Sequence, residues 1–158
     1  MHLLSAKPGG FVDDEGIIDL GQSPADIIVL AAADSLLSAL GQALDAWQTG
    51  HSPSVRLANW MQLVKPAAYD LYEDAVLDKP TQKGRAQVVV LSLLGGQHYW
   101  PYGFERLQAW AKAKRNRHLI IVPGDDSADP EIMQASSADQ ISVQRVWRYL
   151  REGGQANA

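Results

Sequence analysis

Four short apolar runs without alternation constrain the fold of this chain more than any other feature. They cover residues 27–31, 55–60, 88–91 and 119–122, and the second is the weakest because polar residues interrupt it. A strand that is buried on both faces reads as a continuous apolar run. Helical patterns separate the runs, which predicts an α/β fold. We expect an open, mostly parallel sheet of four to five strands with helices on both faces, in a flavodoxin-like or Rossmann-like three-layer arrangement.

The segments between the runs show apolar residues at helical spacing. The first helix is expected to begin near Asp34 and end by Gly50, and the second to begin at Pro66, which suits a first helical turn. A third helix is expected over 103–116, and a last one ends at Gly153. A further edge element is expected at residues 3–4 or 16–20.

The length of 158 residues corresponds to a single domain, so we expect residues 1–158 to form one α/β domain. The last residues read as a helix cap followed by the start of a linker. We therefore expect this domain to be part of a much longer chain.

Composition excludes several classes of function. A formal net charge of −4 argues against a nucleic-acid or membrane-surface partner, because phosphate neutralisation requires a basic surface. The absence of cysteine excludes disulfides, zinc–thiolate sites and thiol nucleophiles. The longest apolar stretch, 27–33, is too short to cross a bilayer, and the first residues do not resemble a signal peptide. We expect a cytoplasmic location.

Ligands of open parallel sheets bind beyond the carboxyl ends of the strands. The most unusual of these ends is 95–103, which we call the glycine–aromatic loop. Glycines allow a ligand close to the backbone, aromatic rings stack on flat groups, and an imidazole donates, accepts or binds a metal. The predicted binding residues there are Gly95, Gly96, His98, Tyr99, Trp100 and Tyr102. The alternative is that the aromatic rings lock the loop onto the sheet and the imidazole is solvated.

Two other strand ends supply weaker candidates. Asn59 closes the second run, and Asp125 and Asp126 lie in an acidic turn after the fourth. The acidic turn is able to attract a cation, but aspartates that satisfy local backbone donors are the favoured interpretation. No histidine pair has metal-ligand spacing, so we expect no metal site in this domain and assign no catalytic residue. The Walker A, Gly-x-Gly-x-x-Gly and Gly-x-Ser-x-Gly motifs are also missing.

Several stretches together resemble one family. Residues 1–16, 24–30, 56–63, 93–96 with 99–103, and 123–126 are similar to the N-terminal part of the large subunit of aerobic, ATP-dependent cobaltochelatase, in the superfamily of the magnesium chelatase large subunit. The resemblance implies a metal–tetrapyrrole ligase of cobalamin biosynthesis that inserts cobalt into hydrogenobyrinic acid a,c-diamide. Its implied partners are the remaining domains of the large subunit, two AAA+ type subunits that hydrolyse ATP, and the corrinoid substrate.

The resemblance also limits what this domain is expected to do alone. Cobalt and ATP are needed by the whole complex, whereas none is expected to bind this domain, which is expected to be inactive in isolation. The glycine–aromatic loop is predicted to cover the macrocycle, with His98 relaying a proton or transiently holding cobalt. The alternative is a non-catalytic lid or an interaction module that docks the motor subunits or the rest of the large subunit. A third interpretation, an independent small-molecule-binding protein, requires a deep pocket at the strand ends.

Overall fold

A four-stranded parallel sheet forms the centre of the molecule. The computed structural model describes residues 5–7, 10–12, 16–47, 52–80 and 85–153, with side chains from residue 16 onward. The sheet has the order β5-β4-β6-β7, and every neighbouring pair is parallel. Its strands are β4 (Ile27–Ala31), β5 (Val55–Asn59), β6 (Val88–Leu93) and β7 (His118–Pro123). The expected open parallel sheet is therefore confirmed.

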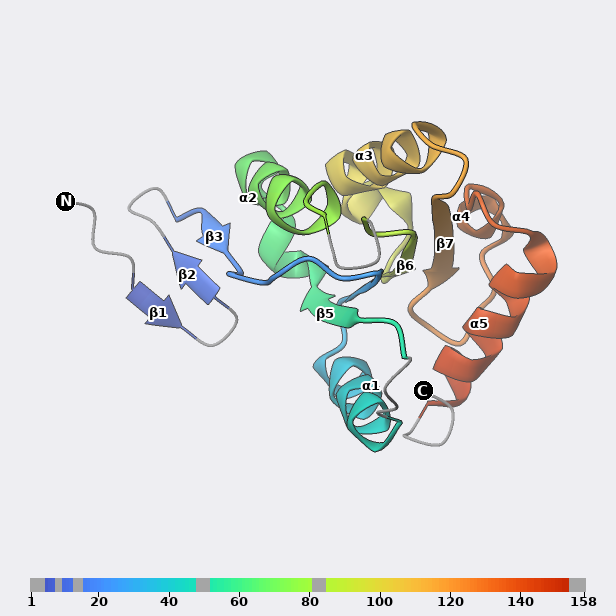
Figure 1. Ribbon diagram of the computed structural model, residues 1–158. Helices are drawn as coiled ribbons and strands as arrows, with labels where there is room; N and C mark the ends of the chain where they lie inside the picture. The colour runs from blue at the N-terminus through green and yellow to red at the C-terminus, as the bar shows by residue number, and fades with distance from the viewer. Residues whose placement is uncertain (1–4, 8–9, 13–15, 48–51, 81–84, 154–158) are drawn as a thin grey trace.

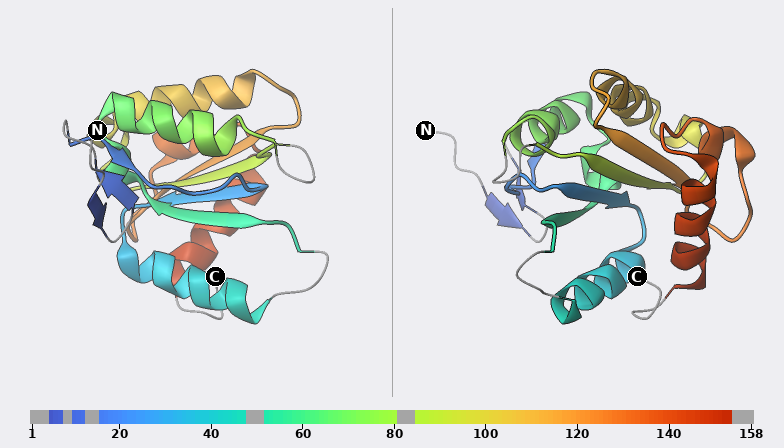
Figure 2. Two further views of the ribbon diagram at one scale, coloured as in Figure 1. Left: turned by 60° about the vertical axis from the view of Figure 1, so that its left-hand side comes forward. Right: turned by 45° about the vertical axis from the view of Figure 1, so that its right-hand side comes forward.

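Helices cover both faces of this sheet and complete three layers (Figures 1 and 2). On one face lie α2 (Pro66–Tyr72) and α3 (Pro101–Lys112), and on the other lie α1 (Asp34–Ala46) and α5 (Gln140–Glu152). The register aligns Val29 with Leu57 and Val90, so these three side chains share a face. That face is the α1 side, because a Cβ on Gly41 of α1 would lie 3.9 Å from Leu57 Cδ1.

The helix boundaries depend on capping residues, which the apolar pattern does not reveal. The third helix begins at Pro101, two residues before the expected start, since proline suits the first helical turn. A short helix, α4 (Pro130–Gln134), was not expected; the Asp129 carboxylate accepts a hydrogen bond from Ile132 N and caps it. The second helix continues past Tyr72 as a π-helical turn, η2 (Glu73–Leu77).

The N-terminal segments form a second, smaller sheet. Strands β1 (Ser5–Lys7), β2 (Gly10–Val12) and β3 (Ile18–Asp19) pair antiparallel in sequence order. The prediction that 16–20 extends the main sheet is therefore wrong, because β3 pairs with β2 and belongs to the separate N-terminal sheet. The other candidate edge, residues 3–4, lies outside the described residues. Lys65 Nζ donates to Gly16 O over 3.3 Å and links this region to the start of α2.

Aromatic side chains fill the space between the sheet and the α2/α3 layer. The indole rings of Trp60 and Trp100 stack with centroids 5.4 Å apart and 9° between their planes. Tyr69 meets Trp100 edge-on, with ring centroids 5.6 Å apart. Leu71 is 45% exposed, because the large rings of Tyr69 and Tyr72 occupy the inner positions of α2. In the described part of the chain, no helix is long and apolar enough to cross a bilayer.

Candidate functional site at the carboxyl edge of the sheet

The parallel sheet brings all four strand ends to one edge. The chain leaves β4 through α1 toward β5, whereas it leaves β6 through α3 on the opposite face toward β7. Neighbouring strands β4 and β6 therefore flank the point where the direction of winding reverses, which is where ligands of such folds bind. The segments at this edge are 32–34, 60–64, 94–100 and 124–129.

The two glycines that open the glycine–aromatic loop have different roles. Both have positive φ, 84° at Gly95 and 85° at Gly96, which glycine adopts without a steric penalty. A Cβ on Gly95 would collide with the ring of Tyr99, so this glycine makes room for that ring. A Cβ on Gly96 would meet nothing closer than Asp129 Oδ2 at 4.0 Å. The backbone at Gly96 is therefore not covered by neighbouring side chains at this edge.

Two of the three aromatic rings in the loop are used inside the domain. Trp100 is 1% exposed beneath Trp60, and a Cβ on Gly103 would collide with its indole. Tyr102 donates its hydroxyl to Asp70 Oδ1 over 2.5 Å. Trp100 and Tyr102 thus fasten the loop to the sheet and to α2, which the alternative interpretation expected of all three rings. Trp100 is buried and offers no ring face to a ligand.

The side chains of His98 and Tyr99 are exposed to solvent. Both lie on the 3-10 turn η3 (Gln97–Tyr99), and Tyr99 is 69% exposed. The Gln97 amide donates to Glu131 Oε1 over 3.2 Å, and Gly124 N donates to Leu93 O over 2.7 Å. The loops after β6 and β7 are therefore held together, and His98 and Tyr99 project from a fixed base.

Asn59 uses its amide to join the strand ends themselves. Its Nδ2 donates to Ala32 O over 3.3 Å and to Asp34 Oδ1 over 3.2 Å. Its Oδ1 accepts from Met61 N over 3.0 Å, which caps the 3-10 turn η1 (Trp60–Leu63). The side chain joins β5 to the start of α1, so these contacts leave little of it for a ligand.

The acidic turn after β7 has the geometry of a local backbone turn. Asp125 and Asp126 are exposed, and Asp125 Oδ1 accepts from Ser127 N over 3.0 Å. This is the aspartate turn that the sequence favoured over a cation site. Within the ranges that the structure describes, no three histidine or acidic side chains are grouped so as to hold a metal ion.

An apolar surface that the sequence did not single out lies at the same edge. Eight large apolar side chains are exposed in the described chain, and four of them lie in the segments that follow β5 and β6. We call these four the rim: Met61, Val64, Leu94 and Tyr99. Their positions after a strand were visible in the sequence, but no pattern distinguished them from buried neighbours such as Trp60 and Leu63.

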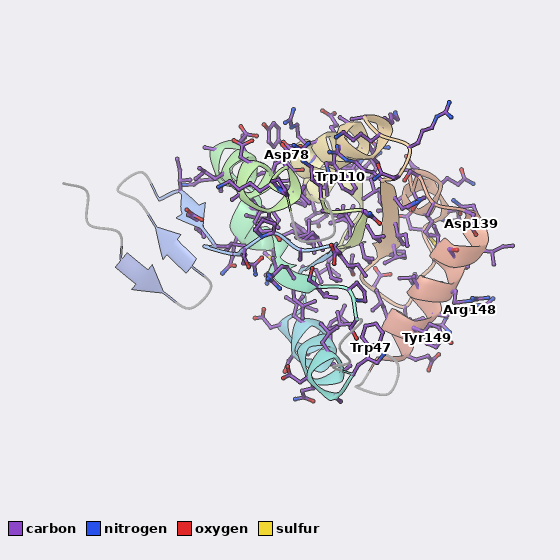
Figure 3. All side chains as sticks on the ribbon, in the orientation of Figure 1. Trp47, Asp78, Trp110, Asp139, Arg148 and Tyr149 are labelled. Carbon is purple, nitrogen blue, oxygen red and sulfur yellow. The ribbon has the colours of Figure 1, made fainter. Side chains whose placement is uncertain are left out.

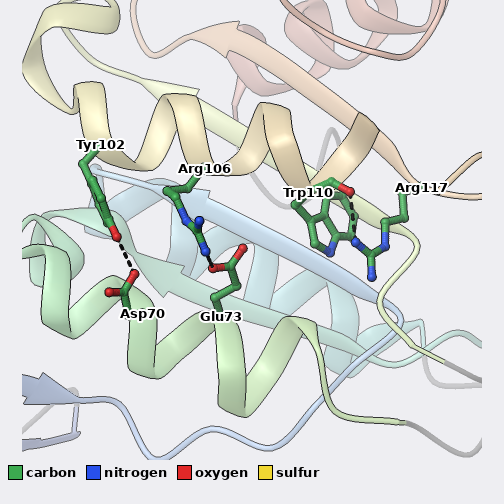
Figure 4. Close-up of polar contacts among 6 residues, drawn as sticks. All are labelled: Asp70, Glu73, Tyr102, Arg106, Trp110 and Arg117. Atoms are coloured by element: carbon green, nitrogen blue, oxygen red, sulfur yellow. Dashed lines mark hydrogen bonds and ion pairs between the residues drawn. The ribbon is translucent and has the colours of Figure 1, made fainter. Parts of the chain in front are cut away.

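A second group missed by sequence reasoning joins α2 to α3 (Figure 4). The Arg106 guanidinium forms an ion pair with Glu73, one turn from the contact between Tyr102 and Asp70. Burial raises the pKa of Glu73 above its ordinary value, and the hydrogen bond from Arg106 counteracts part of this rise. The π-helical turn places Glu73 in this contact. These bonds make the layer beneath the rim a rigid support.

The arrangement of residues at this edge suits binding better than catalysis. The rim presents apolar groups beside the Trp60–Trp100 stack, and the exposed carboxylates of Asp34, Asp125 and Asp126 lie at the same edge of the sheet. Exposed apolar clusters with polar surroundings are typical of interaction surfaces. The described residues place no nucleophile beside a base at this edge.

Comparison with known proteins finds relatives of a single kind. The chain is 46% identical over all 158 residues to the aerobic cobaltochelatase subunit CobN of Pseudomonas aeruginosa, and 38% identical over the same length to that of a Sinorhizobium species. It covers 12% of the length of each relative. No family model matches the chain.

A solved structure has the same fold. It is the catalytic subunit of cobaltochelatase from Mycobacterium tuberculosis, with a TM-score of 0.59 and 23% identity over 83% of this chain and 9% of that one. At this identity the structural match shows the fold alone, whereas the sequence matches show the relationship. Over its whole length, this chain is therefore similar to a part of the CobN subunit of aerobic cobaltochelatases.

Proposed function

We propose that this chain is the N-terminal domain of the large subunit of an aerobic cobaltochelatase. The complete complex inserts cobalt into hydrogenobyrinic acid a,c-diamide, and two AAA+ type subunits hydrolyse the ATP that drives the reaction. The observation that carries the proposal is the 46% identity over every residue of the chain. Cobalt and the corrinoid are substrates of the complex in this scheme.

Two features of this chain bear on which part of the complex carries the chemistry. The Gly-x-x-x-x-Gly-Lys-Ser/Thr motif that cradles phosphates is missing from the sequence. The described residues also lack a three-ligand metal cluster. We therefore assign ATP hydrolysis to partner subunits and metal insertion to the remaining part of the large subunit. The contribution left to this domain is binding and positioning.

We assign to the rim the role of a contact surface for the motor subunits. Met61, Leu94 and Tyr99 are exposed. Methionine and aromatic residues are enriched in the cores of protein interfaces. Direct contact with the corrin is the second candidate, favoured by the exposed pair His98 and Tyr99. A corrin acid with two amidated side chains keeps other carboxylates, and the aspartates around the rim would repel them. The first role is therefore preferred.

Substitutions in the complete complex test the proposal and separate the two roles. Leu94→Ser with Tyr99→Ala is expected to weaken association of the motor subunits about tenfold, to slow cobalt insertion, and to leave corrin affinity unchanged. Glu105→Ala, an exposed change on α3, is the matched control. Loss of corrin affinity with normal subunit association would support the second candidate. Full activity and full association would contradict both roles of the rim.

A broader experiment tests the proposal that this chain is a domain of the cobaltochelatase large subunit. The complex is assembled with a large subunit that lacks this domain, and cobalt insertion is followed by the absorbance of the corrin. Loss of insertion that is restored by the intact subunit is expected. Unchanged insertion would show that the domain has no part in the reaction.

A further inference from the structure

The outer face of helix α5 combines exposed apolar residues with arginines. Its inner face packs Val143 and Trp147 into the core. Its outer face carries two large apolar residues, Ile141 at 75% exposed and Tyr149 at 54% exposed. Arg148 and Tyr149 extend from α5, which lies at one outer edge of the molecule (Figure 3).

A groove of about 730 Å³ runs along this outer face. Ile141, Arg145, Arg148 and Tyr149 line it, and every residue that lines it belongs to α5. Small-molecule sites enclose most of the ligand between several walls. A groove lined by a single helix is open on its other sides. It therefore fits a partner that covers those sides, which favours a protein surface.

The charge of the groove indicates the chemistry of that partner. Within the described residues, Arg145 and Arg148 form no ion pair, whereas Arg151 pairs with Glu152 and lies over the ring of Trp147. The chain as a whole carries a formal net charge of −4, so this positive face is a local exception. Arginine and tyrosine beside an exposed aliphatic group are enriched at the centres of protein interfaces. A complementary surface is acidic with an apolar part.

The length of the relatives offers a place for such a surface. This chain covers 12% of the length of each CobN relative, so in those proteins most of the polypeptide lies outside this fold. Glu152, the last residue of α5, lines the groove. In a chain of that length, the segment after α5 therefore starts beside the groove, and its high effective concentration favours contact in the same polypeptide.

We propose that the outer face of α5 docks the domain onto an acidic, partly apolar surface in the remaining part of the same large subunit. This inference rests on the proposal that the chain is a domain of that subunit. It does not depend on what the rim contacts or on the chemistry of cobalt insertion. In this arrangement α5 anchors the domain, and the rim at the carboxyl edge stays free for another partner.

Cysteine labelling of the full-length large subunit tests the docking. Ile141→Cys introduces a thiol on α5, and Glu105→Cys introduces one at an exposed position of α3 as the control. The maleimide labelling rate of each is followed by mass spectrometry of the tryptic peptide, which separates it from other thiols of the subunit. The thiol introduced on α5 is expected to react at least about tenfold more slowly than the control thiol on α3. Equal rates would overturn the inference.

A charge reversal then tests the acidic nature of the surface. R145E with R148E, on the Ile141→Cys background, is expected to raise the labelling rate to that of the control position. K114E with R115E, the same charge change at the exposed end of α3, is expected to leave the α5 thiol protected. Protection that survives R145E with R148E would overturn the acidic partner.

Two further outcomes keep this inference separate from the proposed function. Protection of the α5 thiol that arises only after the motor subunits are added would overturn docking within one polypeptide. Equal labelling of the α5 and α3 thiols in a subunit that still supports cobalt insertion would overturn the docking alone and leave the proposed function intact.

Discussion

The apolar side chains on the two faces of the central sheet are not buried to the same degree. On the α2/α3 face, Ile28 and Leu30 of β4 and Leu91 of β6 are fully buried. On the α1/α5 face, the part beneath α5 is also buried, with Ile120 and Val122 of β7 at most 8% exposed. The part beneath α1 differs: Leu57 and Val90 remain partly exposed, α1 has no buried residue, and Trp47 at its end is 53% exposed. The α2/α3 face is therefore a finished core, whereas the part of the other face beneath α1 presents apolar area that further polypeptide is able to cover.

Side-chain size accounts for the difference. The α2/α3 face receives large rings from several segments, including Trp60, Tyr69 and Trp100, which interlock between sheet and helices. The apolar face of α1 consists of leucine and alanine, and a groove of about 440 Å³ remains between its second half and β5. We therefore expect the α1/α5 side, in addition to the rim, to contact further polypeptide.

Tryptophan truncation is expected to give the largest contrast between the faces. Trp100→Ala removes a buried ring from the stack with Trp60 and is expected to lower the free energy of unfolding by about 3–5 kcal/mol. Trp47→Ala on the other face is expected to cost about 1 kcal/mol or less. Denaturant unfolding of both variants measures the two values. Equal losses would contradict the claim that the α1 side of the sheet is less completely packed than the α2/α3 side.

Glycine substitutions are expected to change stability in opposite directions. A Cβ on Gly103 would collide with the Trp100 indole, so Gly103→Ala is expected to cost about 1–3 kcal/mol. Gly41 lies inside α1, where a Cβ would make only ordinary contact with Leu57. Gly41→Ala is therefore expected to stabilise the chain by about 0.5–1 kcal/mol. Thermal unfolding measures both, and destabilisation by Gly41→Ala would show that the α1 face is tightly packed.

The ion pair on the α2/α3 face predicts a pH dependence. Burial raises the pKa of Glu73, so the folded chain holds this proton to higher pH than the unfolded chain does. Stability from this group is therefore greatest on the acid side and falls as pH rises through the raised pKa. Glu73→Gln does not ionise and is expected to gain stability relative to the wild type over that window. Parallel pH profiles in denaturant unfolding would contradict this account, and Glu105→Gln is the exposed control.

The smallest effect on folding is expected at the rim. Tyr99→Ala removes a side chain that is mostly in solvent and is expected to change the free energy of unfolding by no more than about 0.5 kcal/mol. Circular dichroism during denaturation checks this. A loss comparable to that of Trp100→Ala would show that the rim belongs to the folding core, and it would remove the basis for assigning it to binding.

The sequence was sufficient for the strands and for their common carboxyl edge. Unalternating runs at β4, β6 and β7 report burial on both faces, and parallel order then follows from the intervening helices. It was insufficient to separate Tyr99 from Trp100, which are neighbours of similar character. Their different environments depend on Trp60, far earlier in the chain, and on the space left by Gly103. The rim and the Glu73–Arg106 pair likewise depend on packing between distant segments.

Hydroxyl-radical footprinting tests the difference between the two faces most directly. Oxidation of Trp47 and Tyr149 is compared between the 158-residue chain and the full-length large subunit, and slow oxidation of buried Trp110 in both reports that the fold is intact. We expect Trp47 and Tyr149 to be oxidised readily in the chain alone and to be strongly protected in the full-length subunit. Equal oxidation in the two proteins would contradict the conclusion that the α1/α5 face is the side covered by further polypeptide.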